Sequence, residues 1–333
     1  MTHVSGVGSW PGESSREAII TVRDLLTDVE GLGLPYLPEL PSRGPGADII
    51  GRSAALLADL SVDLQPSGWR FTDRPGRDML RARAHLRQDL DELAEAYDGY
   101  AGPLKIQVAG PWTLGASIEL NRGERSLTDG GARRDLVGSL AEGVRRHIAD
   151  VQRLVPGAVI TVQLDEPSVV SVLRGELPTA SGYGRVRAVD RVEVARGIQD
   201  VREAHDGDVV LHSCHPAAPV ELLAATGVTA LALDLTESSP QRWEAIAEAV
   251  ESGTRLWAGV VPTTAVTSSA DAVRTATALV LDGFSRVGLP TSSLADVTVT
   301  PTCGLPSLTP RGAVDVQRVA IAVAAELTEK END

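Results

Sequence analysis

Three observations predict an α/β fold, and within that class a (β/α)8 TIM barrel. Short β-rich runs that end in Gly, Pro or polar residues alternate with longer amphipathic stretches, the pattern of parallel strands joined by helices. Eight such runs can be counted, and eight is the strand number of this barrel. No GxGxxG follows the first run, which disfavours an open doubly wound sheet. The runs span residues 3–10, 35–40, 104–111, 159–167, 209–214, 230–235, 255–262 and 296–303.

The sequence pattern indicates the helices between these runs more clearly in some segments than in others. The segment between the second and third runs is long, and it predicts an insertion at about 59–100 that holds a hairpin around residues 63–72 and a charged helix near 78–96. No linker, repeat or break in composition divides the chain, so we expect residues 1–333 to form a single barrel domain. The clearest helix is the last one, where apolar residues recur at helical spacing at Val316, Val319, Ala320, Val323 and Leu327.

Composition narrows the class of ligand. The chain has 333 residues, of which 43% are hydrophobic, and a net charge of −14. No run of Lys and Arg stands out, so we expect a small-molecule substrate and neither a nucleic-acid nor a membrane partner. The N-terminus lacks the features of a signal peptide, and no segment is apolar enough to span a membrane, so we expect a cytoplasmic protein.

Polar residues gather at the ends of the predicted strands, where a barrel carries its active site. The first run ends near Ser9, and the second ends at Glu39, with Arg43 just beyond. Asp165 and Glu166 close the fourth run, His212 and Cys214 the fifth, Asp234 the sixth and Cys303 the eighth. Packing alone does not explain this distribution.

The cysteines suggest a metal site. His212 and Cys214 are two residues apart, so on a strand their side chains share one face. Cys303 joins them if the barrel closes, and one imidazole with two thiolates suits zinc. Asp234 is the best fourth candidate and Glu237 the alternative. In the simpler interpretation, both cysteines, the only two in the chain, are buried small hydrophobic residues.

These motifs resemble a family. The HxC pair, an acidic residue one βα unit later and the string TPTCGLPSLTPRGA at 300–313 are similar to the zinc site of cobalamin-independent methionine synthases. GSWP at 8–11, GPWT at 110–113 and LDEP at 164–167 resemble further family elements in the same order. The resemblance covers the catalytic half of the long two-domain enzymes and implies a single catalytic barrel.

The resemblance implies a zinc-dependent methyltransferase that converts a thiol such as homocysteine to methionine. His212, Cys214, Cys303 and Asp234, in place of the family's glutamate, would bind Zn²⁺, while Asp165, Glu39 and the backbone around Ser9 would hold the amino acid. The methyl donor, a folate or a corrinoid, stays open, because residues 258–265 (AGVVPTTA) lack the histidine expected after strand seven. The alternatives are a metal-free decarboxylase-type member of the same superfamily and a non-catalytic barrel that binds zinc or a thiol.

Overall fold

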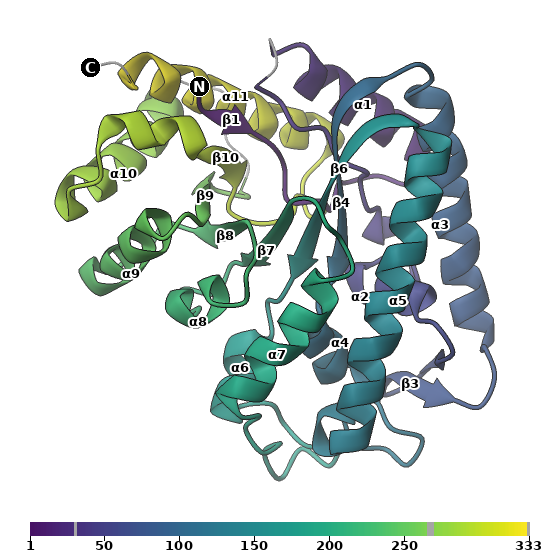
Figure 1. Ribbon diagram of the computed structural model, residues 1–333. Coiled ribbons are helices and arrows are strands. Elements are labelled where there is room, and N and C mark those ends of the chain that lie inside the picture. Colours follow the sequence, from purple (N-terminus) through teal and green to yellow (C-terminus); the bar gives the residue numbers. More distant parts are fainter. Residues whose placement is uncertain (30–31, 265–269, 332–333) are drawn as a thin grey trace.

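A parallel sheet of seven strands forms the centre of the protein in a computed structural model, which describes residues 1–29, 32–264 and 270–331 (Figure 1). Neighbouring strands follow the order β1-β10-β9-β8-β7-β6-β4, and every pairing in this sheet is parallel. The strands are β1 (His3–Val4), β4 (Ala101–Ala109), β6 (Gly157–Asp165), β7 (Val209–Ser213), β8 (Ala230–Asp234), β9 (Arg255–Val261) and β10 (Thr298–Pro301).

The predicted second strand closes the sheet into a barrel without forming a regular strand. Its segment bridges β1 through Val4 and Gly33 on one side and β4 through Tyr36 and Lys105 on the other. Pro35 and Pro38 have no N–H to donate, so the ladder is reduced to isolated bonds such as Leu37 N to Lys105 O at 3.0 Å. The predicted (β/α)8 barrel is therefore confirmed, with an irregular strand in second position.

Helices cover the outside of the barrel, and many of them begin at a capping side chain. Ser14, Asp48, Asp129, Asp190, Ser239 and Thr309 each accept a hydrogen bond from an N–H in the first turn of the helix that follows. The helices are α1 (Ser15–Thr27), α2 (Ile49–Leu56), α3 (Arg77–Ala96), α4 (Pro111–Ser117), α5 (Gly130–Leu154), α6 (Val169–Arg174), α7 (Arg191–Arg202), α8 (Val220–Ala224), α9 (Pro240–Glu251), α10 (Ala270–Val287) and α11 (Pro310–Lys330).

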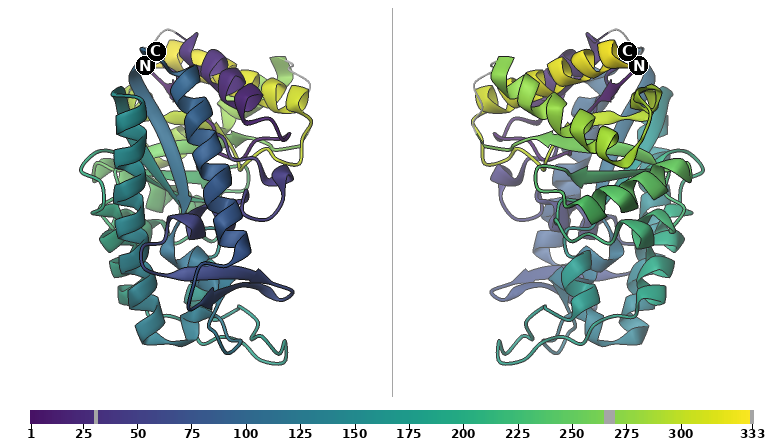
Figure 2. Two further views of the ribbon diagram at one scale, coloured as in Figure 1. Left: turned by 90° about the vertical axis from the view of Figure 1, so that its right-hand side faces the viewer. Right: turned by 90° about the vertical axis from the view of Figure 1, so that its left-hand side faces the viewer.

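A second, smaller sheet extends the fold beyond the barrel. Strands β2 (Ser61–Gln65) and β3 (Gly68–Thr72) form the hairpin predicted in the insertion, and β3 also pairs with the short strand β5 (Ile118–Glu119). This sheet and the loop between α6 and α7 lie at the end of the molecule opposite the two termini (Figure 2). Both follow the C-terminal ends of strands in the chain, since the hairpin comes after the irregular second strand and the loop comes after β6.

The termini lie side by side, and the ammonium group of Met1 is 3.0 Å from the Glu331 carboxylate. Buried aliphatic residues from the strands and the inner faces of the helices form one large core. In the described part of the chain, no helix is long and apolar enough to cross a lipid bilayer.

Candidate active site

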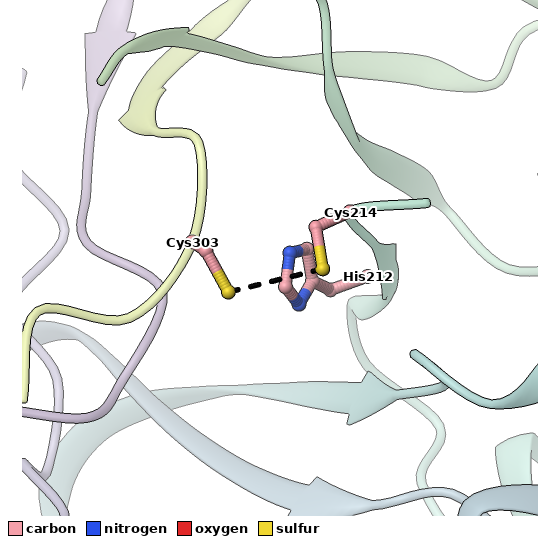
Figure 3. Close-up of side chains that lie close together, drawn as sticks. All are labelled: His212, Cys214 and Cys303. Carbon is pink, nitrogen blue, oxygen red and sulfur yellow. Dashed lines mark hydrogen bonds between the residues drawn. The ribbon is translucent and has the colours of Figure 1, made fainter. Parts of the chain in front are cut away.

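His212, Cys214 and Cys303 meet at the C-terminal rim of the barrel. Their side-chain ligand atoms all lie within 4.8 Å of one another, and the two sulfur atoms are 3.8 Å apart (Figure 3). His212 is the fourth residue of β7, Cys214 follows the end of that strand, and Cys303 follows β10. Residues that are distant in sequence therefore converge because the barrel closes.

The two thiols influence each other's protonation. Their contact at 3.8 Å lowers the pKa of Cys303 to about 6 and raises the pKa of Cys214, because one proton shared between the two sulfur atoms stabilises a thiolate on Cys303. The imidazole of His212 also favours the Cys303 thiolate. The site is thus prepared to hold at least one anionic sulfur at neutral pH.

Asp165 supports His212 directly. The two residues are cross-strand partners in the β6–β7 register, and Asp165 Oδ1 lies 2.8 Å from His212 Nδ1. Burial disfavours the imidazolium form, but the contact with Asp165 outweighs burial and raises the pKa of His212. His212 Nε2 is buried and has no hydrogen-bond partner among the described residues. A buried imidazole nitrogen in this condition is suited to binding a metal ion.

Ser9 and Glu39 lie together beside this group. Ser9 Oγ donates to Glu39 Oε2 at 3.4 Å, and the Ser9 carbonyl accepts from Leu305 N at 2.9 Å, which ties the first rim segment to the loop that carries Cys303. Burial raises the pKa of Glu39 to about 7, and the negative charge of Asp165 contributes to the rise, whereas Arg52 opposes it. The three predicted substrate residues therefore share one electrostatic environment.

Asp234 and Glu237 stand apart from the His-Cys-Cys group. Among the described residues, the cluster of possible metal ligands contains neither of them. Asp234 Oδ1 accepts from the backbone N–H of Thr236 at 2.9 Å and from its hydroxyl at 2.6 Å, while Glu237 is exposed. The fourth-ligand prediction therefore stays a prediction.

Glu166, next to Asp165, serves the fold. Its carboxylate accepts from the N–H groups of Trp112 and Thr113 at 2.8 Å each, so it caps the first turn of α4. Because successive residues at a strand end point to opposite sides, Asp165 and Glu166 of the DEP motif have separate tasks.

Two interior residues near the site, Lys105 and Gln163, were not predicted from the sequence. Both are fully buried, and Gln163 Nε2 donates to Asp165 Oδ1 at 2.7 Å. The signal was present in the strands, because LKIQV and VITVQLD place polar residues at alternating positions inside otherwise apolar runs.

A parallel barrel with an imidazole, two thiols and carboxylates on its C-terminal rim defines the protein as a barrel enzyme. The family model of the cobalamin-independent synthase catalytic domain matches residues 99–326. The chain belongs to that family and is a methyltransferase of the methionine synthase type, as its motifs predicted.

Comparison with a solved methionine synthase supports the fold. A B12-independent methionine synthase from a Shewanella species, in complex with selenomethionine, has a TM-score of 0.62 and 10% identity, and the match covers 99% of this chain and 98% of that one. A GH5_18 protein from Streptomyces cattleya matches at a TM-score of 0.46 and 15% identity over 98% of this chain and 81% of that one, which is too distant to support an argument. A search of curated protein sequences found no match.

Proposed function

We propose that the protein transfers a methyl group to the thiol of homocysteine and forms methionine, with zinc held by His212, Cys214 and Cys303. The observation that carries this proposal is the convergence of two thiols and a buried, unpartnered imidazole nitrogen on one rim. Family membership supplies the reaction class, and the rim supplies the chemistry that a thiol substrate needs.

The donor set fits zinc in both chemistry and spacing. Thiolates and imidazole are preferred zinc ligands, and two sulfurs bound at about 2.3 Å in a tetrahedral site lie about 3.8 Å apart. The sulfurs of Cys214 and Cys303 are 3.8 Å apart. Zinc, when bound, would lower the pKa of a substrate thiol so that the thiolate is available at neutral pH.

Asp234 is the fourth ligand that we propose. Leu233 pairs with Ser213 in the β7–β8 register, which puts the backbone of Asp234 beside that of Cys214. Side chains two residues apart on a strand share a face, so Asp234 and Ala232 lie on the same side, and Ala232 pairs with His212. To bind the ion, the Asp234 carboxylate would have to leave Thr236, whereas Glu237 starts from an exposed position.

Asp165, Glu39 and Ser9 suit the amino-acid part of the substrate. Asp165 Oδ1 is occupied by Gln163 and His212, and the described residues provide no hydrogen bond to Oδ2. Glu39 Oε1 is buried, has no hydrogen-bond partner among the described residues, and lies 3.7 Å from the Arg52 guanidinium. Two carboxylates that retain capacity to accept hydrogen bonds would bind an ammonium group, and the backbone near Ser9 would receive the carboxylate. The selenomethionine of the Shewanella protein is an amino acid of this kind.

The methyl donor, a folate or a corrinoid, stays open. Methyl transfer exchanges the bond from the donor to the methyl carbon for a sulfur–carbon bond, and the proton of the thiol leaves to solvent or to the donor. Thr263 and Thr264 follow β9, where the resemblance led us to expect a histidine, so the described residues in that segment offer no obvious proton donor.

The experiment measures methionine formed from homocysteine with methyltetrahydrofolate or methylcobalamin, using zinc-loaded protein. We expect turnover with one donor and its loss in Cys214→Ser. Ser213→Ala is the matched control, because Ser213 lies between His212 and Cys214, is fully buried and has no hydrogen-bond partner for Oγ among the described residues. Zinc binding without turnover on either donor would instead favour a thiol-binding barrel.

A further inference from the structure

Lys105 places a buried positive charge inside the barrel. The side chain is fully buried on β4, and Nζ donates to the Val7 carbonyl at 2.8 Å and to Gln163 Oε1 at 2.7 Å. It also lies 5.0 Å from the centre of the Tyr36 ring. Burial lowers the pKa of Lys105 to about 7, although Asp165 and Glu39 oppose this shift. A buried ammonium group is costly unless its hydrogen bonds are satisfied, and here they are made to groups inside the barrel.

The contacts of Lys105 fix the orientation of the Gln163 amide. An ammonium group only donates, so Gln163 must turn its oxygen toward Lys105. The other side of the amide meets only acceptors, since Nε2 lies 2.8 Å from the Val7 carbonyl and 2.7 Å from Asp165 Oδ1. If the amide were flipped, its oxygen would lie against the Val7 carbonyl and Asp165 Oδ1, and its nitrogen would lie against the Lys105 ammonium group. One orientation alone satisfies all these groups.

Gln163 in turn fixes Asp165 against His212. Asp165 Oδ1 accepts from Gln163 Nε2 and lies 2.8 Å from His212 Nδ1. A carboxylate at this distance favours the proton on Nδ1, which leaves the lone pair on Nε2. Nε2 is buried, has no hydrogen-bond partner in the described part of the chain, and is the atom available to a metal ion.

We propose that Lys105 and Gln163 are positioning residues that hold His212 in the tautomer able to bind the metal ion, through a chain of hydrogen bonds from the barrel interior to the rim. The inference rests on the proposed function, because it assigns the chain to the zinc site. Neither residue touches substrate or metal, and both act through Asp165.

The first test uses metal-free protein and therefore does not depend on zinc. Long-range ¹H–¹⁵N NMR of ¹⁵N-histidine protein identifies the tautomer of His212, and His212→Ala assigns its signals. For the neutral imidazole of the wild type we expect the Nδ1–H form. In Lys105→Met and Gln163→Met we expect a mixture of tautomers.

The second test measures zinc affinity by competition with a chromophoric chelator. We expect Lys105→Met and Gln163→Met to weaken zinc binding by about tenfold, the lower end of the range for residues that support a metal ligand. Gln107→Met is the matched control: Gln107 pairs with Gln163 across β4 and β6, is also buried, and bonds to the Leu37 carbonyl at 2.7 Å. It should keep wild-type affinity.

The outcomes separate the two proposals. Wild-type protein that binds no zinc would overturn the proposed function. The NMR measurement of the His212 tautomer would still test the hydrogen-bond chain, because it uses metal-free protein. Wild-type protein that binds zinc, with both Met variants within twofold of it and an unchanged His212 tautomer, would overturn the positioning role. If one variant fails to fold by circular dichroism, the other decides, since they break the chain at different links.

Discussion

Replacing Asp165 with Asn should weaken zinc binding while the fold survives. Asp165 is buried, and its Oδ1 faces Gln163 Nε2 at 2.7 Å and His212 Nδ1 at 2.8 Å. Asn has almost the same shape and can still accept from Nδ1–H. What it removes is the negative charge that strengthens this bond and keeps the proton on Nδ1.

The expected magnitude follows from the loss of charge. A hydrogen bond to a charged group contributes about 1.5–3 kcal/mol, whereas a neutral one contributes about 0.5–1.5 kcal/mol. The difference of about 1–1.5 kcal/mol corresponds to an affinity about five to ten times weaker, since about 1.4 kcal/mol is a factor of ten. Chelator competition at pH 7 measures the dissociation constant, and thermal unfolding checks the fold.

Glu166→Gln is the control for this prediction. Glu166 is adjacent in sequence and equally buried, but its carboxylate caps α4 through Trp112 and Thr113. Its replacement should lower the melting temperature and leave zinc affinity unchanged. Equal zinc affinity in Asp165→Asn and the wild type would refute the reasoning, because it would show that the bond from Asp165 to His212 does not support a metal ligand.

Three further predictions concern charge. In metal-free protein the pKa of Cys303 is about 6, so this thiol should react with iodoacetamide at pH 7 faster than an ordinary thiol, and the labelling rate should fall below pH 6. Peptide mass mapping measures the labelling of each cysteine, and equal labelling of Cys214 would contradict the prediction. Arg52 and Arg43 form ion pairs with the buried Asp89, and these contacts outweigh burial and lower its pKa. The Asp89 carboxylate therefore stabilises the fold above about pH 4 and loses that effect as the pH falls. Asp89→Asn should lower the free energy of unfolding, measured with urea at pH 7, by about 3 kcal/mol, and a decrease below about 1 kcal/mol would contradict this role. The pKa of Glu39 is raised to about 7, so its contribution to stability falls as the pH rises from about 4.5 to 7. Glu39→Gln should stabilise metal-free protein by about 1–3 kcal/mol at pH 8 and by less at pH 5, and it should raise the KM for homocysteine. An equal change in stability at both pH values would contradict the raised pKa of Glu39.

Much of the fold could be predicted because local signals and the barrel agree. Alternation of β-rich and amphipathic segments predicted an eight-stranded parallel barrel, and several helices begin at capping residues such as Ser14 and Thr309. The second strand was harder, because Pro35 and Pro38 break its ladder while the segment still closes the barrel. Its pairing depends on contacts to β1 and β4 that no local window contains.

The site was predictable where residue type carries the chemistry. Two cysteines and a histidine at strand ends pointed to one rim, and the structure brings their ligand atoms within 4.8 Å. The contacts that orient them were not predictable, since Lys105 and Gln163 act through partners on different strands. Glu166 is the opposite case: it belongs to the LDEP motif, which suggested a role in the site, but its carboxylate caps a helix. Only the direction of its side chain in the structure reveals this.

X-ray absorption spectroscopy with metal quantification on purified protein tests the central claim most directly. We predict one zinc ion per chain with two sulfur ligands at about 2.3 Å, and the loss of one sulfur in either Cys214→Ser or Cys303→Ser. Protein that binds no zinc after incubation with the metal, or a zinc environment without sulfur, would contradict the account.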